Sequence, residues 1–162
     1  MLSESFDRST LINEIVYTLG RELSTQTMMY HAAIAEKLGL NPTDHKALGF
    51  IDRAGSMTAG QLAELTGLTT GAVTGIVDRL EKAGFVQRIK VAHDRRQVII
   101  QPIPERVQTI HHLFESIGKS ISELTDRYSD RDLAIIHDYL AQSIRVVRAE
   151  TMKLKSVNQE TD

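Results

Sequence analysis

The chain has 162 residues, of which 41% are hydrophobic and 25% are charged, so one packed domain with or without extensions is expected. It contains no cysteine, which excludes disulfides, a thiolate zinc site and a thiol redox switch. The formal net charge of −2 does not by itself suggest a nucleic-acid-binding protein.

The basic residues are concentrated in the middle of the chain. Residues 44–104 contain eight bases and six acids, whereas acids outnumber bases in the segments on either side. The narrower window 69–100 contains six bases and three acids. Charge alone is compatible with an ordinary protein surface, so the motifs must decide what this basic region does.

The first residues, MLSESFDRST, lack both the basic and the apolar region of a secretory signal, and no run of 18 apolar residues predicts a membrane span. We therefore expect a cytoplasmic protein without membrane contact.

A long helix is predicted over residues 8–38 because apolar residues recur at steps of three and four. These residues are Leu11, Ile12, Ile15, Val16, Leu19 and Leu23. A second helix follows to about Arg53, with Asn41 as its N-cap and Pro42 in its first position.

Two further helices are predicted after Gly55. Thr58 and Gln61 form a capping box, and the short helix that they begin is expected to bury Leu62 and Leu65 and to end at Gly67. Thr69 caps the next helix, which runs to residue 83 and ends before Gly84. Its expected buried residues are Val73, Ile76, Val77 and Leu80. Two helices joined by a tight turn that contains glycine are typical of a helix-turn-helix.

A β-hairpin is predicted over residues 85–101. The runs FVQRIKV and QVIIQPI are rich in β-branched residues, and the polar segment AHDRR between them is expected to provide a loop of roughly four residues. Two long amphipathic helices follow, the first from Glu105 and the second from a capping box at Ser129 and Asp132. The predicted fold is therefore mainly α: a winged helix-turn-helix with a small β-hairpin wing, flanked by long N- and C-terminal dimerisation helices.

The segment QLAELTGLTTGAVTGIVDRLEKAGFVQRIKVAHDRRQVIIQ resembles the MarR (multiple antibiotic resistance regulator) family, most specifically in VDRLEKAGFV followed by DRR. The resemblance extends over nearly the whole chain. It implies a ligand-responsive transcriptional regulator, most simply a repressor, that binds a pseudo-palindromic DNA operator as a homodimer. The expected DNA-binding domain is residues 39–104, and the expected dimerisation region is residues 1–38 and 105–162.

A recognition helix at 69–83 would enter the major groove, and a wing at 85–101 would enter the minor groove. The expected DNA-binding residues are Thr58, Thr69, Thr70, Gly71, Thr74, Gly75, Arg88, Lys90, Asp94, Arg95 and Arg96. The family pattern implies that Arg96 enters the groove and that Asp94 orients it or tightens the loop. The alternative is a turn capped by Asp94 with solvated arginines.

Several neighbouring residues are open to two interpretations. Lys46 and Gln61 are further candidates for phosphate contacts, whereas Arg79 is expected to brace the fold. The exposed glycines Gly71 and Gly75 either let the DNA approach the helix backbone or are simply tolerated by the fold.

The resemblance also implies a small aromatic effector, and six residues are candidates to line its cleft. These residues are Met28, Met29, Tyr30, His31, His111 and Phe114. The alternative is that the methionines and the phenylalanine among them belong to the core and that the histidines are solvated or capped. No metal site is expected, because His111 and His112 point about 100° apart on a helix. Cofactors and catalysis are not expected either, since no nucleophile–base motif or glycine-rich phosphate loop is present. The alternative function is a winged-helix module that binds another protein instead of specific DNA.

Overall fold

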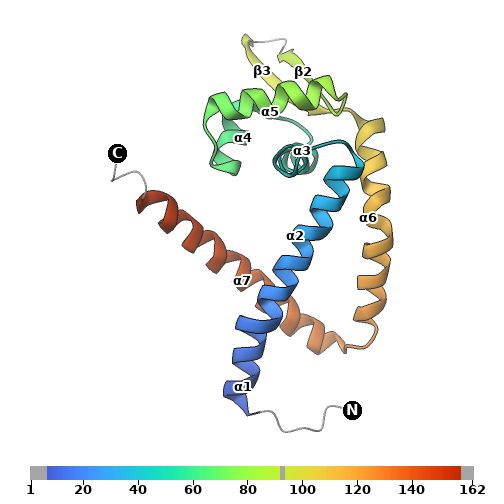
Figure 1. Ribbon diagram of the computed structural model, residues 1–162, viewed down its shortest axis with the longest axis vertical. Coiled ribbons are helices and arrows are strands. Elements are labelled where there is room, and N and C mark those ends of the chain that lie inside the picture. The colour runs from blue at the N-terminus through green and yellow to red at the C-terminus, as the bar shows by residue number, and fades with distance from the viewer. Residues whose placement is uncertain (1–6, 92–93, 158–162) are drawn as a thin grey trace. The chain divides into compact units, whose positions relative to one another are not determined.

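The computed structural model describes residues 7–91 and 94–157, with the side chains of 91–96 and 155–157 left undescribed. The chain divides into two compact units, Met1–Leu113 and Phe114–Asp162. The first unit contains the N-terminal helix, the winged helix-turn-helix and the start of α6, and the second contains the rest of α6 and α7 (Figure 1).

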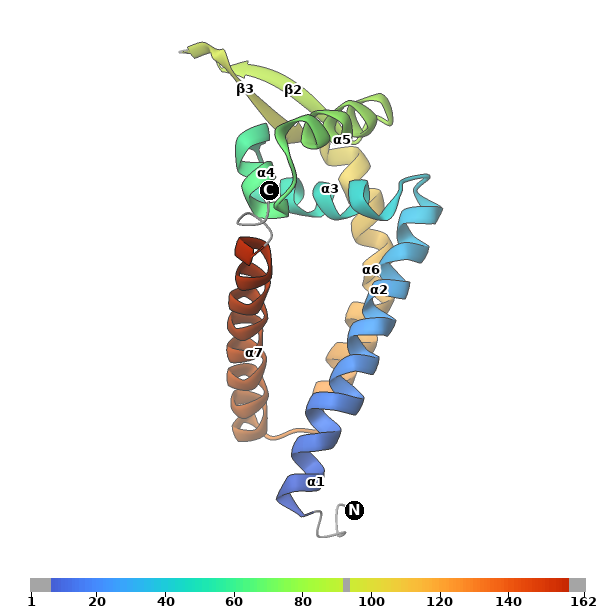
Figure 2. The same ribbon diagram turned by 60° about the vertical axis from the view of Figure 1, so that its left-hand side comes forward.

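The N-terminal helix is one continuous rod made of three segments (Figure 2). These are α1 (Arg8–Asn13), η1 (Glu14–Leu19) and α2 (Gly20–Lys37). The predicted long helix is therefore present, but η1 is a π-helix, which the sequence analysis did not foresee. The rod ends at Gly39, whose φ of 68° suits glycine and lets the chain turn into α3.

The helix-turn-helix consists of three helices with the predicted caps. They are α3 (Pro42–Ala54), α4 (Ala59–Thr66) and α5 (Thr70–Lys82). The side chains of Asn41, Thr58 and Thr69 each accept a hydrogen bond from the backbone N–H three residues later. These bonds satisfy N–H groups that have no partner within the helix, so each helix begins at a defined residue.

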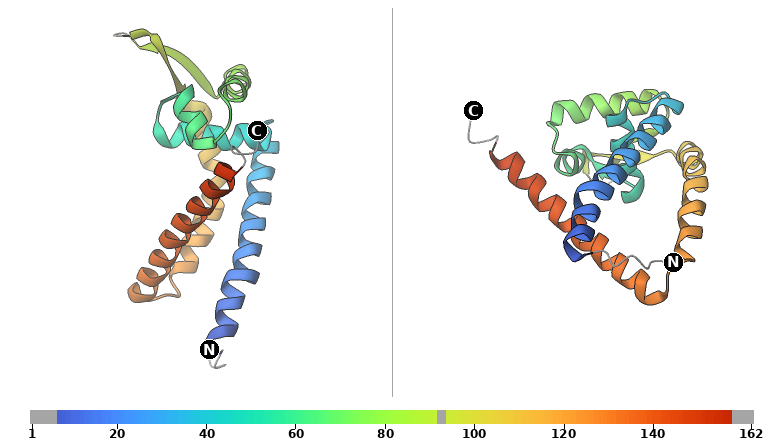
Figure 3. Two further views of the ribbon diagram at one scale, coloured as in Figure 1. Left: turned by 90° about the vertical axis from the view of Figure 1, so that its left-hand side faces the viewer. Right: turned by 60° about the horizontal axis from the view of Figure 1, so that its bottom comes forward.

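A small antiparallel sheet forms the wing. Its strands are β1 (Met57–Thr58), β2 (Val86–Val91) and β3 (Asp94–Pro102), in the order β1-β3-β2. Strand β1, which the sequence analysis missed, pairs Met57 with Ile100. The predicted loop of roughly four residues is too long, because the backbone of residues 94–96 already belongs to β3 and Asp94 pairs with Val91. The hairpin projects beyond the helices of the helix-turn-helix (Figure 3, left).

The core of the first unit lies between the helix-turn-helix and the inner face of the sheet. Its fully buried side chains are Leu48, Ile51, Leu62, Val73, Val77, Leu80, Phe85, Val86 and Ile100. All four predicted inward positions of α5 are buried, which fixes the orientation of this helix on the core. Leu65 is a correction, because its side chain is 55% exposed whereas the sequence analysis expected it to be buried.

The two long C-terminal helices are α6 (Pro104–Thr125) and α7 (Asp130–Val157). The predicted capping box begins α7: the Ser129 hydroxyl accepts from the Asp132 N–H, and the Asp132 carboxylate accepts from the Ser129 N–H. α7 exposes many apolar side chains, including Ile135, Ile136, Tyr139, Leu140, Ile144, Val146 and Val147. In the part of the chain that the structure describes, every helix is too short or too polar to cross a membrane.

Candidate DNA-binding surface

The start of α5 presents a row of small polar residues. Thr70, Gly71 and Thr74 are exposed, and the N-cap Thr69 is exposed as well. The Thr69 hydroxyl accepts a hydrogen bond from the Ala72 N–H at 3.3 Å, and the Thr74 hydroxyl donates to the Thr70 carbonyl at 2.9 Å. Thr74 therefore keeps its oxygen lone pairs and its methyl group available for a ligand, while its proton is already used.

The two glycines of α5 have different surroundings. A Cβ at Gly71 would meet nothing within 4 Å among the described residues, so this position is open. Gly75 is half-buried, and a Cβ there would lie 3.4 Å from Nη1 of Arg79. The fully outward position expected for Gly75 is thus corrected, because it faces the Arg79 guanidinium. Both glycines line a shallow groove of about 500 Å³ between α5 and the start of α3.

Arg79 connects α5 to α3 through a bidentate ion pair. Its Nε and Nη2 atoms donate to Oδ2 and Oδ1 of Asp44, each at 2.7 Å. The Asp44 carboxylate is almost fully buried, whereas the Arg79 side chain is 53% exposed. The hydrogen bond to Asp44 raises the pKa of the Arg79 guanidinium above its ordinary value. This contact supports the bracing role expected for Arg79.

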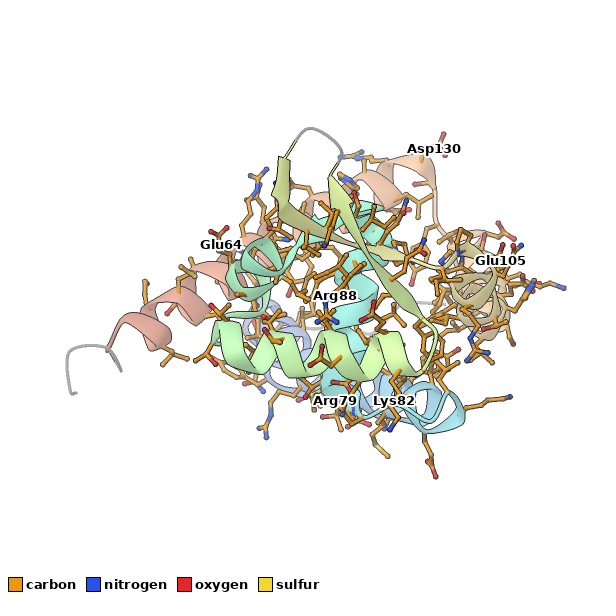
Figure 4. All side chains as sticks on the ribbon, turned by 90° about the horizontal axis from the view of Figure 1, so that it is seen from above. Glu64, Arg79, Lys82, Arg88, Glu105 and Asp130 are labelled. Carbon is orange, nitrogen blue, oxygen red and sulfur yellow. The ribbon has the colours of Figure 1, made fainter. Side chains whose placement is uncertain are left out.

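Arg88 connects the wing to the other side of α5. Its guanidinium donates to Asp78 at 2.6 Å and to Glu81 at 2.5 Å, and its backbone N–H donates to Glu81 at 3.0 Å. Partial burial opposes the charge of Arg88, but the hydrogen bonds that it donates to the carboxylates of Asp78 and Glu81 outweigh this effect and raise the pKa of the guanidinium. Arg88 lies between the wing and α5, with Arg79 on the opposite side of the helix (Figure 4).

The side chains predicted to contact phosphates differ in how far they are already engaged by other residues. Arg88 stays a candidate, but its guanidinium is already bonded to two acids of α5. Lys90, the second residue after Arg88 on β2, is exposed and pairs with Val98 on β3. Lys46 is exposed on α3, with its Nζ atom 5.8 Å from the centre of the Phe50 ring. The two lysines therefore have the greater freedom to reach phosphates.

The remaining predicted DNA contacts lie at the start of α4 and at the tip of the wing. Thr58 and Gln61 bond each other reciprocally, since the Thr58 N–H donates to the Gln61 side chain at 2.8 Å and the Thr58 hydroxyl accepts from the Gln61 N–H at 3.2 Å. Asp94, Arg95 and Arg96 belong to β3 by their backbone, but their side chains lie outside the described part. Their roles in DNA binding stay predictions.

Three of the predicted effector residues, on α2 and α6, make contacts with other helices of the first unit. The Tyr30 hydroxyl donates to the Leu113 carbonyl at 2.8 Å, His31 Nδ1 lies 3.3 Å from His45 Nε2, and His111 Nε2 lies 2.9 Å from a carboxylate oxygen of Asp52. Met28 does not join them, since it is exposed on α2. Phe114 belongs to the second compact unit.

Several residues that make contacts at or beneath this surface were not singled out as site residues by the sequence analysis. They are Asp44, His45, Asp52, Asp78 and Glu81. A usable signal exists only for Asp78 and Glu81, which lie one helical turn apart and so share a side of α5. The other three depend on contacts between helices that no local pattern predicts.

Comparisons with known proteins match this architecture. A model of the MarR family matches residues 38–97. The uncharacterized HTH-type transcriptional regulator YcgE of Bacillus subtilis (strain 168) is 42% identical over 137 residues, which cover 85% of this chain and 89% of the relative. The multiple antibiotic resistance protein MarR of Salmonella typhimurium is 23% identical over 143 residues, 88% of this chain and 96% of that protein.

Solved structures show the same fold. A MarR family protein from Bacillus stearothermophilus aligns with a TM-score of 0.68 at 19% identity, covering 89% of this chain and 99% of that one. A mutant of S. aureus MepR, solved bound to an oligodeoxyribonucleotide, aligns with a TM-score of 0.57 at 16% identity. That alignment covers 80% of this chain and 95% of the MepR chain.

Proposed function

The chain belongs to the MarR family of winged helix-turn-helix transcriptional regulators, and we propose that it is a sequence-specific repressor that binds a pseudo-palindromic operator as a homodimer. The observation that carries the proposal is the exposed start of α5, where Thr70, Gly71 and Thr74 stand free of the core beside a projecting wing. MepR, which has a similar fold, binds an oligodeoxyribonucleotide, and this supports the same ligand class here.

The proposed base contacts in the major groove involve only a few small residues of α5. A threonine hydroxyl can bond either kind of base edge, and its methyl group can contact the methyl of thymine. Thr70 and Thr74 supply these groups, while Gly71 lets the duplex approach the helix backbone because no side chain intervenes. With so few long side chains on this face, the shape of the DNA carries much of the specificity.

The proposed readout in the minor groove comes from the wing. A narrow minor groove concentrates negative potential, which favours an inserted arginine. Arg96 is the proposed inserting residue, with Asp94 orienting it and Arg95 contacting phosphate. The strand pairing of β2 and β3 supports this arrangement, because it fixes the direction in which the hairpin extends.

Homodimerisation is proposed from the apolar surface outside the winged helix-turn-helix. The apolar residues of α1 and η1, namely Leu11, Ile12, Ile15 and Val16, are between 40% and 47% exposed, and α7 exposes a second apolar series. Surfaces of this kind usually bury against a second copy. Two-fold symmetry would set the half-site centres about one helical turn, roughly 10 bp, apart.

We further propose a small aromatic effector that weakens DNA binding. Tyr30, His31 and His111 supply aromatic and polar groups beside α3, and α3 is bonded to the recognition helix through Asp44. A ligand that displaced these side chains would therefore act on a helix that positions α5.

The experiment that tests this function is fluorescence-anisotropy titration of the DNA that flanks the protein's own gene, at several salt concentrations. The parent should prefer this DNA over random DNA by about 10³-fold or more, with affinity falling steeply as salt rises. Arg96→Ala should lose about tenfold or more in affinity, whereas Arg127→Ala, a matched exposed arginine in the turn before α7, should bind like the parent. Equal binding to random DNA would instead favour a protein-binding winged helix.

A further inference from the structure

The N-terminal rod contains an unusual turn at η1 (Glu14–Leu19). The backbone N–H of Gly20 donates to the carbonyl of Ile15, five residues earlier, where an α-helix would use Val16. Such π-helical turns are rare and behave as one extra residue inserted into an α-helix. The rod therefore changes its helical register between α1 and α2.

Gly20 is the residue that permits this turn. A Cβ at Gly20 would lie 2.8 Å from the Ile15 carbonyl oxygen, which is closer than non-bonded carbon and oxygen atoms approach. The obstructing atom belongs to the backbone and accepts the π-type hydrogen bond itself, so it cannot rotate away. By contrast, a Cβ at the helical glycines Gly49 and Gly118 would meet nothing within 4 Å in the described part of the chain.

The inserted residue corrects a mismatch in the apolar pattern. Downstream, Ile34 and Ala35 mark the side of α2 that is buried. Counting back from them at about 3.6 residues per turn reaches positions near 31, 27, 24, 20, 16.5 and 13. Upstream, the apolar pairs 11–12 and 15–16 are centred about one residue earlier than this series. The single extra residue inserted at η1 absorbs that offset, which otherwise amounts to about 100° of rotation.

We propose that Gly20 is a positioning residue for homodimerisation, because its π-turn aligns the apolar pairs of α1 and η1 with the core-facing side of α2. This inference rests on the proposed homodimer. The occupant of the exposed apolar pairs is a second copy of this chain, which brings an identical stripe and the apolar series of α7, as an isologous interface requires. The helical register of the rod therefore determines whether the apolar pairs and the winged helix-turn-helix can face the same partner molecule.

The test compares Gly20→Ala with a double variant in which Gly20→Ala is combined with deletion of Thr18. Thr18 is exposed and polar, so its removal takes away the extra residue without touching the apolar stripe. Alanine at position 20 should force an α-helical turn and rotate the stripe, raising the dimer dissociation constant tenfold or more in sedimentation-velocity dilution series. The double variant should recover the parental dissociation constant, because an α-helix one residue shorter restores the register. Gly49→Ala is the matched control and should dimerise like the parent.

Each outcome decides a separate point. A parent that stays monomeric at all concentrations overturns the homodimer itself. A dimeric parent with an equally dimeric Gly20→Ala overturns only the role of Gly20. Weak dimerisation of Gly20→Ala that the Thr18 deletion does not repair shows that register is not the cause. If Gly20→Ala alone is unfolded by circular dichroism, a folded and dimeric double variant still supports the inference, and an unfolded or monomeric one overturns it.

Discussion

Arg79 on α5 and Asp44 on α3 are joined by two parallel hydrogen bonds of 2.7 Å, 35 residues apart in the sequence. Asp44 is also part of the N-terminal cap of α3, where its N–H donates to the Asn41 side chain and its carboxylate accepts from the Asn41 amide. A bidentate arginine–carboxylate pair fixes direction as well as distance. The recognition helix is thereby tied to the first turn of α3, and Gly75 leaves room for the guanidinium.

Breaking this pair should lower DNA affinity although neither residue is proposed to contact a base. Arg79→Ala leaves a buried carboxylate without its cation, so we expect a lower melting temperature and about tenfold weaker operator binding. Arg79→Lys should recover only part of the affinity, because an ammonium cannot form the bidentate fork. Anisotropy titration and thermal unfolding of the two variants measure both effects.

The matched control for this prediction is Arg53→Ala, which removes an exposed arginine of α3 that stacks on Phe50. It should leave operator affinity unchanged. The combination of Arg79→Ala with Asp44→Asn, which keeps an acceptor for the Asn41 amide, should bind no worse than Arg79→Ala alone, because both changes disable one pair. Fully additive losses would show that Arg79 acts by itself, for example on a phosphate.

Arg88 gives a second prediction, because its two acidic partners lie on the recognition helix. Removing Arg88 leaves the negative charges of Asp78 and Glu81 uncompensated near the phosphates and releases β2 from α5, so Arg88→Ala should weaken operator binding about tenfold. Adding Asp78→Asn and Glu81→Gln to Arg88→Ala should recover much of the loss. The measurement is the operator dissociation constant over a salt series.

The salt series separates this brace from a direct phosphate contact. A phosphate contact would lower the slope of affinity against salt by about one, and neutralising the two acids would not restore the lost contact. Lys90→Ala serves as the comparison, since Lys90 is exposed on the same strand and is a proposed phosphate contact. Recovery by neutralisation in the Arg88 variants, without any change of slope, is the expected pattern.

The features that could be predicted from the sequence are those set by neighbouring residues. The caps at Thr58 and Thr69 depend on hydrogen bonds to residues three positions away, and the inward side of α5 depends on its 3.6-residue period. The pairs of Arg79 with Asp44 and of Tyr30 with Leu113 join distant segments, so no local pattern contains them.

Three errors have a similar physical origin. The wing loop was predicted too long because a polar sequence says little about where strand pairing stops, and Asp94 in fact pairs with Val91. The two-residue strand β1 was missed because it exists only through its pairing with Ile99 and Ile100. The π-turn was missed because apolar residues at steps of three and four fit an α-helix until the offset across Gly20 is counted.

Thr69 combines a structural and a proposed DNA-binding role, which a pair of substitutions separates. Thr69→Ala removes the hydroxyl that accepts from the Ala72 N–H, so the free energy of unfolding should fall by about 1 kcal/mol. Thr69→Asp keeps a capping acceptor and adds negative charge, so stability should be retained while operator affinity falls by repulsion from phosphate. Urea unfolding and anisotropy titration measure the two properties; equal DNA binding by Thr69→Asp and the parent would place Thr69 away from the duplex.

The contact between His31 and His45 should make stability depend on pH. Burial lowers the pKa of His45 below its ordinary value, and the charges of His31 and Lys46 lower it further. Burial likewise lowers the pKa of His31, with Lys46 and Arg53 adding repulsion. Since the unfolded chain then binds more protons than the folded one, stability should be complete above the ordinary histidine pKa of about 6.5 and should fall as pH drops through that value.

Melting temperatures measured across this range test the prediction. The parent should lose stability steadily below about pH 6.5 until the depressed pKa values are reached, and His45→Gln should flatten that part of the curve. His137→Gln, which changes an exposed histidine of α7, should leave the slope unchanged. His45 follows Asp44, the ion-pair partner of Arg79. Operator affinity should therefore weaken over the same pH interval in the parent, and it should weaken less in His45→Gln. A parental slope that persists in both His45→Gln and His31→Gln would assign the acid sensitivity to other groups.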